Sequence, residues 1–305
     1  MRLKDLDEME LINRLTSGLK ADKDILKHIG DDAAVIKFPK NHLLLFSSDM
    51  LIEGIHFDLK STSWQAIGHK ALARNISDIA AMGGLPRYAT VSLGLPKNYR
   101  LKNIQAVYSG IKKTARKYGL VIAGGDVSSS KILIVNIALI GIAKKKEVTF
   151  RNTAKKGELI FVTGKLGGSI KGKHLNFMPR LEEARYLIKE CKPTAMIDLS
   201  DGLAQDLGHI IHQSNVGAQI HKEVVPVSNK ADSFENALYD GEDFELLFTL
   251  SRKHAIKLKK YWPKFFKLKI SQIGIIVDKK EGFYYLDKFN KKYKIKPKSK
   301  FRHFK

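Results

Sequence analysis

Cysteine is almost missing from this sequence, since Cys191 is the single one among 305 residues. One thiol can form neither an intrachain disulfide nor a zinc site built on several cysteines, so an oxidising compartment is not required. No apolar run approaches the roughly 20 residues that a membrane-spanning helix needs. The first residues, MRLKDLDEMELINRL, show acidic side chains and helical periodicity, which are not typical of a signal peptide. These absences predict a soluble cytoplasmic protein with no membrane partner.

Acidic residues are also scarce, with 31 Asp and Glu against 54 Lys and Arg, a net charge of +23. Such a charge is typical of nucleic-acid or membrane binding. The lysines are scattered, however, through helical stretches and the chain end, and no recognised nucleic-acid motif accompanies them. We therefore predict a solvated basic surface and no nucleic-acid partner. A steep salt dependence of binding to arbitrary DNA would favour the alternative, a basic nucleic-acid-binding module.

The pattern of apolar residues predicts an α/β fold in two domains, residues 1–149 and 150–305, because one domain usually has roughly 100–200 residues. A polar loop after the lysines at 144–146 marks the boundary. In the first half we expect helices at 5–19, 63–82 and 100–118, strands at 33–38, 42–51 and 86–96, and two strands, LVIAGGD and KILIVNIALIGIA, around a polar turn. In the second half we expect a strand ELIFVTG, a glycine-rich turn at 164–172, a helix at 180–190, a strand near 243–250 and a closing strand pair around 273–286.

Many of the few carboxylates share one context, next to glycine or serine at the end of an apolar strand or the start of a helix. These are Asp31 and Asp32 (GDDAAV), Asp49 (SSDML), Asp78 (NISDIAAMGG), Asp126 (AGGDVSSS), Asp198 and Asp201 (MIDLSDGL), and Glu242 and Asp243 (GEDFELLF). Carboxylate oxygens are the ligands of Mg²⁺, whose charge offsets repulsion among aspartates, and small neighbours let backbone N–H groups approach phosphates. The set therefore predicts a site for a nucleotide with several Mg²⁺ ions.

Each motif taken singly has another interpretation. Gly-Asp-Asp is good turn chemistry, Gly124-Gly125-Asp126 fits a hairpin turn, and DLSDGLAQDL fits a capped helix start. Asp78 fits a solvated helix position. No G-x-x-x-x-G-K-[ST] is present, and GKLGGS has the wrong order, so a P-loop kinase is not predicted.

GDDAAV, SSDMLIEGIHF, NISDIAAMGG, AGGD, MIDLSDGLAQDLGHI and GEDFELLF, in this order over nearly the whole chain, resemble the thiamine-monophosphate kinase family. That family belongs to a superfamily of ATP-dependent enzymes that includes aminoimidazole ribonucleotide synthetase. The resemblance implies a homodimer whose N-terminal domains join their strands across the interface, with ATP and several Mg²⁺ ions in the cleft beside the C-terminal domain. It also implies transfer of the γ-phosphoryl group of ATP to thiamine monophosphate, aided by metal ions that bridge phosphate oxygens.

The resemblance assigns roles to individual residues. It implies metal contacts from Asp32, Ser47, Ser48, Asp49, Asp78, Asp126, Asp198 and Asp201, of which Asp32, Asp126 and Asp201 are expected to be catalytic. It implies ATP contacts from Tyr118, Gly125, Asp126, Arg151 and Ser200, and substrate contacts from His56, Glu242 and Phe301. Asp31 is expected to serve the turn. His56 equally fits a buried, hydrogen-bonded strand histidine.

Three positions depart from the family pattern. Ser48 replaces the usual Thr and keeps the hydroxyl, Val127 replaces a common Thr and removes one polar contact, and Phe301 replaces Trp or Tyr and keeps an aromatic ring. Related enzymes fit less well. The reactive N-terminal Cys of selenophosphate synthetase and the C-terminal Cys of a hydrogenase-maturation relative are missing, and the GEDFELLF and FRHF stretches favour the thiamine enzyme over aminoimidazole ribonucleotide synthetase.

Overall fold

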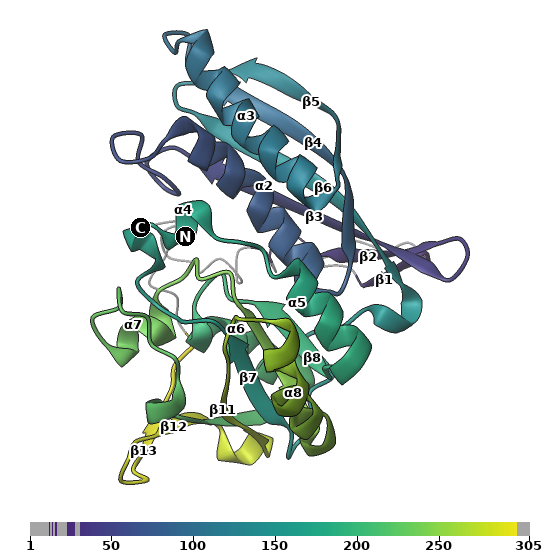
Figure 1. Ribbon diagram of the computed structural model, residues 1–305, viewed down its shortest axis with the longest axis vertical. Helices are drawn as coiled ribbons and strands as arrows, with labels where there is room; N and C mark the ends of the chain where they lie inside the picture. The colour runs from purple at the N-terminus through teal and green to yellow at the C-terminus, as the bar shows by residue number, and fades with distance from the viewer. Residues whose placement is uncertain (1–11, 13, 15, 17–22, 28–30, 298–305) are drawn as a thin grey trace.

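The computed structural model describes residues 12, 14, 16, 23–27 and 31–297. Within them the strands form two sheets, the first drawn in purple to teal and the second in teal to yellow (Figure 1). The predicted α/β fold class is confirmed. The boundary between residues 149 and 150 stays a prediction. The helix predicted at 5–19 falls largely, and Phe301 wholly, outside the described residues.

The first sheet has six strands in the order β1-β2-β3-β6-β4-β5, of which β4 and β5 are parallel and the other pairs antiparallel. Its elements are β1 (Ile25–Lys27), β2 (Ala34–Phe38), β3 (His42–Ile52), α2 (Trp64–Ala81), β4 (Leu85–Leu95), α3 (Leu101–Tyr118), β5 (Val121–Ser129), β6 (Ile134–Lys144) and the 3₁₀ turn η2 (Lys145–Glu147). Helices α2 and α3 cover one face of the sheet, where alternate residues such as Leu45, Val91 and Ile137 are buried. The other face carries exposed residues.

Local sequence accounts for both helices. Ser63 caps α2 by accepting a hydrogen bond from the Ala66 N–H, and Gly119 ends α3 in the left-handed conformation. The two helices cross at glycines, because a Cβ atom added to Gly68 would lie 1.9 Å from the carbonyl oxygen of Val107. A Cβ atom at Gly110 would meet α2 equally closely. The missing side chains therefore set the distance between the helices.

We expect Gly68→Ala to lower the free energy of unfolding by about 1–3 kcal/mol, since the helices must separate to accept the methyl group. This loss should outweigh the roughly 1 kcal/mol by which alanine is favoured over glycine inside a helix. Urea unfolding would measure it. Ser109→Ala, at an exposed α3 position, is the control and should change stability by about 0.5 kcal/mol or less. A Gly68→Ala protein as stable as its parent would contradict the packing argument.

The second sheet has seven strands in the order β13-β12-β9-β11-β7-β10-β8, with β9 and β12 parallel and the other pairs antiparallel. Its strands are β7 (Leu159–Thr163), β8 (Ala195–Asp198), β9 (Gly217–His221), β10 (Leu246–Leu250), β11 (Ile270–Val277), β12 (Phe283–Leu286) and β13 (Lys292–Lys294). Its helices are α4 (Lys173–Asn176), α5 (Leu181–Tyr186), α6 (Leu203–Ser214), α7 (Phe234–Tyr239) and α8 (Arg252–Phe265), and short turns are η3 (Ser169–Lys171), η4 (Leu187–Cys191), η5 (Lys222–Val224) and η6 (Lys279–Glu281).

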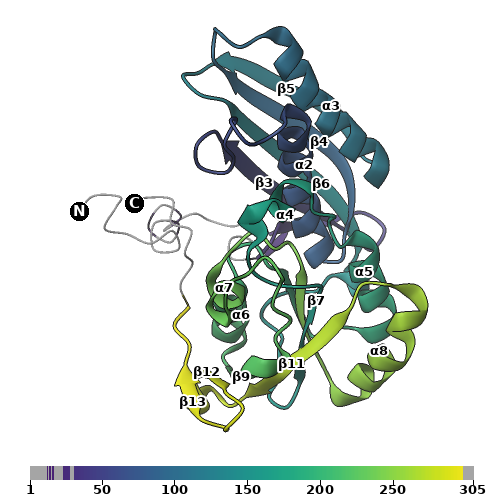
Figure 2. The same cartoon turned by 60° about the vertical axis from the view of Figure 1, so that its left-hand side comes forward.

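Helices cover both faces of this second sheet. Leu207 of α6 and Phe234 of α7 pack with Ile160 on one face, whereas Trp262 of α8 packs with Phe161 on the other (Figure 2). Ala80 and Ala81, at the end of α2, belong to the latter core. Helix α2 therefore packs against both halves of the molecule and can align residues from each.

The predicted strands and the helix at 180–190 form, but three details of their arrangement were not predicted. The two strands around the polar turn, β5 and β6, both form but are separated by β4. Likewise β11 and β12 flank β9 instead of pairing with each other. The predicted helix at 180–190 changes from α-helix to a π-helical turn at Leu187. Strand order depends on contacts between distant segments, which periodicity does not report. Within the described residues, no helix has the length and apolar character to cross a membrane.

Candidate active site

Three carboxylates from distant parts of the chain meet between the two halves of the molecule. Asp32 precedes β2, Asp78 lies in the last turn of α2, and Asp198 is the last residue of β8. One carboxylate oxygen of each lies within 4.8 Å of the other two. The Ser77 hydroxyl donates a hydrogen bond of 2.6 Å to Asp198 Oδ2. Two predicted strand-end motifs and one helix motif therefore converge on one point.

The environment of these carboxylates disfavours their ionised forms. Burial raises the pKa of Asp78 well above its usual range, and the charges of Asp49 and Asp198 raise it further. Burial and the charge of Asp32 raise the pKa of Asp198 in the same way. A divalent cation held by oxygen ligands would relieve this repulsion, so the residues present fit Mg²⁺.

Arg151, in the loop before β7, places a positive charge beside this group of carboxylates. Its Nη2 lies 2.6 Å from Asp32 Oδ1 and its Nε 3.2 Å from Asp32 Oδ2, a two-point contact that fixes the carboxylate. Asp31 lies 3.5 Å from Lys27 Nζ and 3.7 Å from Arg151 Nε, and it accepts a hydrogen bond from the backbone N–H of Arg151. Burial, followed by the charge of Asp32, raises the pKa of Asp31 to about 6. The two adjacent aspartates thus share Arg151, which makes its shorter side-chain contacts with Asp32, and only Asp31 also pairs with Lys27.

A second group of possible metal ligands surrounds the start of α6, where Asp201, Asp206 and His209 each offer an atom within 4.8 Å of the others. Asp206 Oδ2 accepts hydrogen bonds from the backbone N–H groups of Asp201 and Gly202, so it also organises the helix start. Burial and the charge of Arg151 lower the pKa of His209 to about 4, which keeps the imidazole neutral. Its neutral form can serve as a ligand.

A buried lysine connects the two residues predicted to contact thiamine phosphate. Lys70 is fully buried, and its Nζ lies 2.7 Å from Glu242 Oε2, 2.8 Å from the backbone oxygen of His56 and 2.8 Å from His174 Nδ1. Burial lowers the pKa of Lys70 to about 8. Burial acts to raise the pKa of Glu242, but hydrogen bonds and charge from His174 and Lys70 outweigh it and lower this pKa to about 2. Lys70 and Glu242 therefore form an ion pair at neutral pH.

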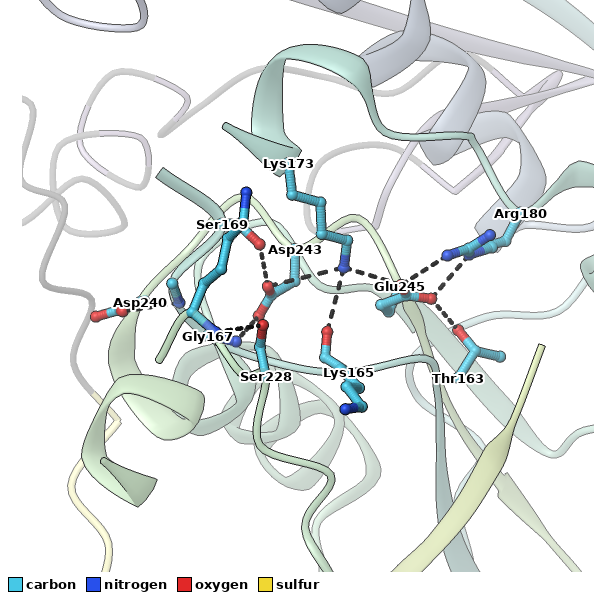
Figure 3. A network of polar contacts seen from close by, with 12 residues as sticks. Thr163, Lys165, Gly167, Ser169, Lys173, Arg180, Ser228, Asp240, Asp243 and Glu245 are labelled. Carbon is cyan, nitrogen blue, oxygen red and sulfur yellow. Dashed lines mark hydrogen bonds and ion pairs between the residues drawn. The ribbon is translucent and has the colours of Figure 1, made fainter. Parts of the chain in front are cut away.

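The GEDFELLF segment sends its acidic side chains in different directions, because Glu242 and Phe244 have positive φ and strand β10 begins only at Leu246. Glu245 accepts two hydrogen bonds, of 2.7 and 2.8 Å, from Arg180, and a contact of 2.9 Å from Lys173 (Figure 3). Lys173 is adjacent to His174 in α4, so one short helix pairs with Glu245 and Glu242 together. This network holds Glu242 in place.

Asp243 binds the glycine-rich turn. Its carboxylate accepts hydrogen bonds from the Ser169 hydroxyl and, at 2.9 Å, from the Gly167 N–H (Figure 3). The neighbouring Gly168 N–H donates to Asp240 at 3.1 Å. These backbone donors therefore contact the carboxylates of Asp243 and Asp240, which hold the glycine-rich turn in place.

Asp243 should make stability depend on pH. Burial raises its pKa from 3.8 to about 6, so the stability that protonated Asp243 contributes is lost as pH rises through 6. Asparagine resembles the protonated acid. We expect the unfolding free energy of the parent, relative to Asp243→Asn, to fall by about 2–3 kcal/mol between pH 4 and pH 7. Denaturant unfolding at several pH values would measure this difference, and a difference that is independent of pH would contradict it.

Strand β3 directs its predicted metal ligands to both faces of the sheet. Ser47 is buried, and its hydroxyl donates to Asn75 Oδ1 at 3.3 Å. Asp49 Oδ1 lies 3.1 Å from Arg74 Nη2 of α2. Ser48 lies between them in sequence and so on the opposite, open face, where its hydroxyl is 3.4 Å from Asn136 Oδ1 of β6. Ser48 is therefore separated from Asp49 by the sheet.

Three predicted ATP contacts lie away from the carboxylate group. Gly125 and the exposed Asp126 lie within β5, an edge strand that β6 and β4 separate from β3. They therefore do not form a hairpin turn. Tyr118 ends α3, with its hydroxyl 3.5 Å from the Pro179 oxygen and its ring against two cores. By contrast, the backbone oxygen of Ser200 accepts a 2.6 Å hydrogen bond from the Glu242 N–H, beside Asp201.

Sequence reasoning missed several residues of this region. They are Lys70, Arg74, Ser77, Asn75, His174, Asp206, His209 and Glu245. Helical spacing contained a signal for some of them, because residues 70, 74 and 78 repeat every four positions on α2 and therefore share the face of Asp78. His174 and Glu245 gave no such signal, since their partners are distant in sequence.

Comparisons with known proteins show the family of this chain. Residues 30–143 match the family model of the AIR synthase related protein, N-terminal domain, and residues 136–287 match that of the C-terminal domain. The thiamine-monophosphate kinase of Buchnera aphidicola subsp. Acyrthosiphon pisum (strain APS) is 37% identical, over 97% of this chain and 98% of its own. That of Aquifex aeolicus (strain VF5) is 34% identical over 100% of both.

A solved structure is similar over the same length. AaThiL complexed with AMPPCP and TMP has a TM-score of 0.85 and 31% identity, and the match covers 100% of this chain and 99% of that one. The similarity of sequence and fold therefore extends over the whole length of this chain. This chain belongs to the thiamine-monophosphate kinase family of AIR synthase related proteins.

Proposed function

We propose that this protein transfers the γ-phosphoryl group of ATP to the phosphate of thiamine monophosphate, which gives thiamine diphosphate and ADP. The observation that carries the proposal is the buried meeting of Asp32, Asp78 and Asp198 beside Arg151. The names of the relatives support the substrate, and the AMPPCP and TMP complexed with AaThiL support one site for a nucleotide and one for the acceptor.

We assign Mg²⁺ binding to Asp32, Asp78 and Asp198, with Asp49 and Asp201 as further ligands. Mg²⁺ held by these residues would neutralise the negative charge of the transferring phosphoryl group. Arg151 holds the Asp32 carboxylate in one direction through its two contacts. Ser77 orients Asp198 in the same manner. These second contacts would preorganise the ligands before the substrates bind.

The reaction requires little proton transfer. A phosphate monoester has its second pKa near 6, so the acceptor is largely a dianion at neutral pH and can attack directly. One of its oxygens forms the new bond to the γ phosphorus while the bond from that phosphorus to the β–γ bridging oxygen breaks, and ADP leaves with the electron pair. The obstacle is repulsion between two anions, which explains a site rich in metal-binding carboxylates and positive side chains.

We propose that Glu242 and His56 bind the thiamine portion of the substrate. Glu242 is ionised, and a carboxylate suits a ligand with a cationic thiazolium ring. Lys70 contacts both Glu242 and the His56 backbone, and so positions one relative to the other. Phe301 lies outside the described residues, and its stacking on the substrate stays a prediction, as does the cytoplasmic location.

A homodimer would cover the open face of the first sheet. Phe46, Met50 and Tyr88 are 43%, 47% and 47% exposed on β3 and β4, and the edge strand β5 exposes Val127. Such apolar faces and edges favour pairing with a second copy. Asp126 lies on this edge strand, so a second copy of the chain that pairs with the strand would place its own polar side chains near Asp126. We propose this as the route by which Asp126 and Ser48 enter the site.

Sedimentation at micromolar concentration is expected to give a particle of twice the 34.4 kDa chain mass. Met50→Glu should shift it toward monomer, because the change buries an unpaired charge in the interface. Ile256→Glu, at a 71% exposed position of α8 away from this sheet, is the control and should stay dimeric. A fully active monomeric parent protein would contradict the dimer.

The function is tested by ADP release with thiamine monophosphate, thiamine or no acceptor, with and without Mg²⁺. We expect ADP and an equal amount of thiamine diphosphate with thiamine monophosphate and Mg²⁺ together, and background rates otherwise. Faster turnover with the substrate of aminoimidazole ribonucleotide synthetase, or no turnover with thiamine monophosphate, would overturn the proposal.

A further inference from the structure

Arg74, in the middle of α2, is a largely buried arginine, with 17% of its side chain exposed, and most of its hydrogen-bonding capacity is unused. Its Nη2 lies 3.1 Å from Asp49 Oδ1. Its Nε and Nη1 are buried, and neither has a hydrogen-bond partner among the described residues. Buried donors without partners are costly and rare in native proteins. The side chain therefore requires an explanation beyond its single ion pair with Asp49.

The position of Arg74 on α2 indicates what it contacts. Lys70, Arg74 and Asp78 follow one another at intervals of four residues, so they lie along one face of the helix, about 6 Å apart along its axis. Lys70 binds Glu242, the proposed thiamine contact, and Asp78 belongs to the proposed metal ligands. Arg74 therefore lies between the thiamine end and the metal end of the site.

The surrounding charges agree with this position. Burial acts to lower the pKa of Arg74. The negative charges of nearby carboxylates outweigh this effect and raise the pKa, in the order Asp49, Glu242, Asp78 and Asp198. The guanidinium thus stays charged while carboxylates from both ends of the site act on it. Thiamine monophosphate has a cationic thiazolium ring, which would lie at the Glu242 end of the site, and a phosphate that must reach the metal ligands. The phosphate would therefore lie between these two ends, where Arg74 is.

We propose that the Arg74 guanidinium binds the phosphate group of thiamine monophosphate and holds the acceptor oxygen toward the metal ligands. This inference rests on the proposed function. Asp49 is itself a proposed Mg²⁺ ligand, so a metal ion there would take over the neutralisation of Asp49 and leave Arg74 to the phosphate. A guanidinium suits this task because it stays charged and offers several N–H donors in fixed directions.

The experiment compares binding of thiamine monophosphate with binding of thiamine, which lacks the phosphate, by calorimetry in the presence of Mg²⁺. We expect Arg74→Gln to weaken binding of thiamine monophosphate by about 10- to 100-fold and to change thiamine binding by less than about 3-fold. Arg116→Gln, which removes one charge from an exposed position of α3, is the matched control and should affect neither ligand.

Equal weakening of both ligands by Arg74→Gln would show a structural role for Arg74, and no weakening would show no contact; either result overturns the inference. If Arg74→Gln does not fold, Arg74→Lys keeps the charge and loses the planar donor group, and it should weaken thiamine monophosphate selectively by a smaller factor. Parent protein that phosphorylates thiamine monophosphate while its Arg74 variants bind that substrate normally would refute this inference and leave the proposed function intact.

Discussion

Replacing Asp78 with asparagine is expected to lower the rate of phosphoryl transfer by about 10³-fold or more and, at the same time, to raise the Tm measured without Mg²⁺. The rate falls because an anionic ligand is lost from the site that stabilises charge on the transferring group. The Tm rises because the folded protein buries Asp78 among Asp49, Asp198 and Asp32, which raises its pKa well above normal. Ionised Asp78 is thus unfavourable in the fold.

The sign of the stability effect can be checked by pH. A carboxyl group with a raised folded-state pKa loses its contribution to stability as pH rises, so the advantage of Asp78→Asn should be largest at neutral and alkaline pH and small near pH 4. Added Mg²⁺ should stabilise the parent more than the variant. Asp232→Asn, at an exposed carboxylate, is the control. A variant that is both less stable and active would show that Asp78 is structural.

The second large effect is expected at the Glu245 network. Arg180→Met should lower the free energy of unfolding by about 3–5 kcal/mol, because it leaves Glu245, whose side chain is 1% exposed, without its two-point partner. Lys173 and the Thr163 hydroxyl still contact Glu245 but do not replace the guanidinium. Denaturant unfolding measures the loss.

A double-mutant cycle identifies the cause of this loss. Adding Glu245→Gln to Arg180→Met should recover part of the stability, since the carboxylate that Arg180 neutralised is then gone. Lys171→Met, which breaks an exposed ion pair with Asp232, is the control and should cost about 1 kcal/mol or less. Additive losses from Arg180→Met and Glu245→Gln would mean that their contact contributes little.

The sequence contained enough information to predict the local elements and to single out the three carboxylates that meet in the fold. Helices α2 and α3 begin and end within one residue of the predicted limits, because apolar spacing and end signals such as Ser63 and Gly119 act over a few residues. The Gly-Asp and Ser-Asp motifs predicted a metal–nucleotide site since those residue types suit that chemistry wherever the chain places them. Alternation along β3 also implies that Ser48 and Asp49 point to opposite faces.

The tertiary structure alone decided which of these residues meet. Asp32, Asp78 and Asp198 converge because α2 packs against both sheets, whereas Asp126 lies on an edge strand that two strands separate from β3. The sequence around Lys70 gives no sign of its role, because its ion-pair partner, Glu242, is 172 residues away. Local periodicity reports which side of an element is buried, but the partner of a buried charge is fixed by the packing of distant segments, so only the folded chain reveals it.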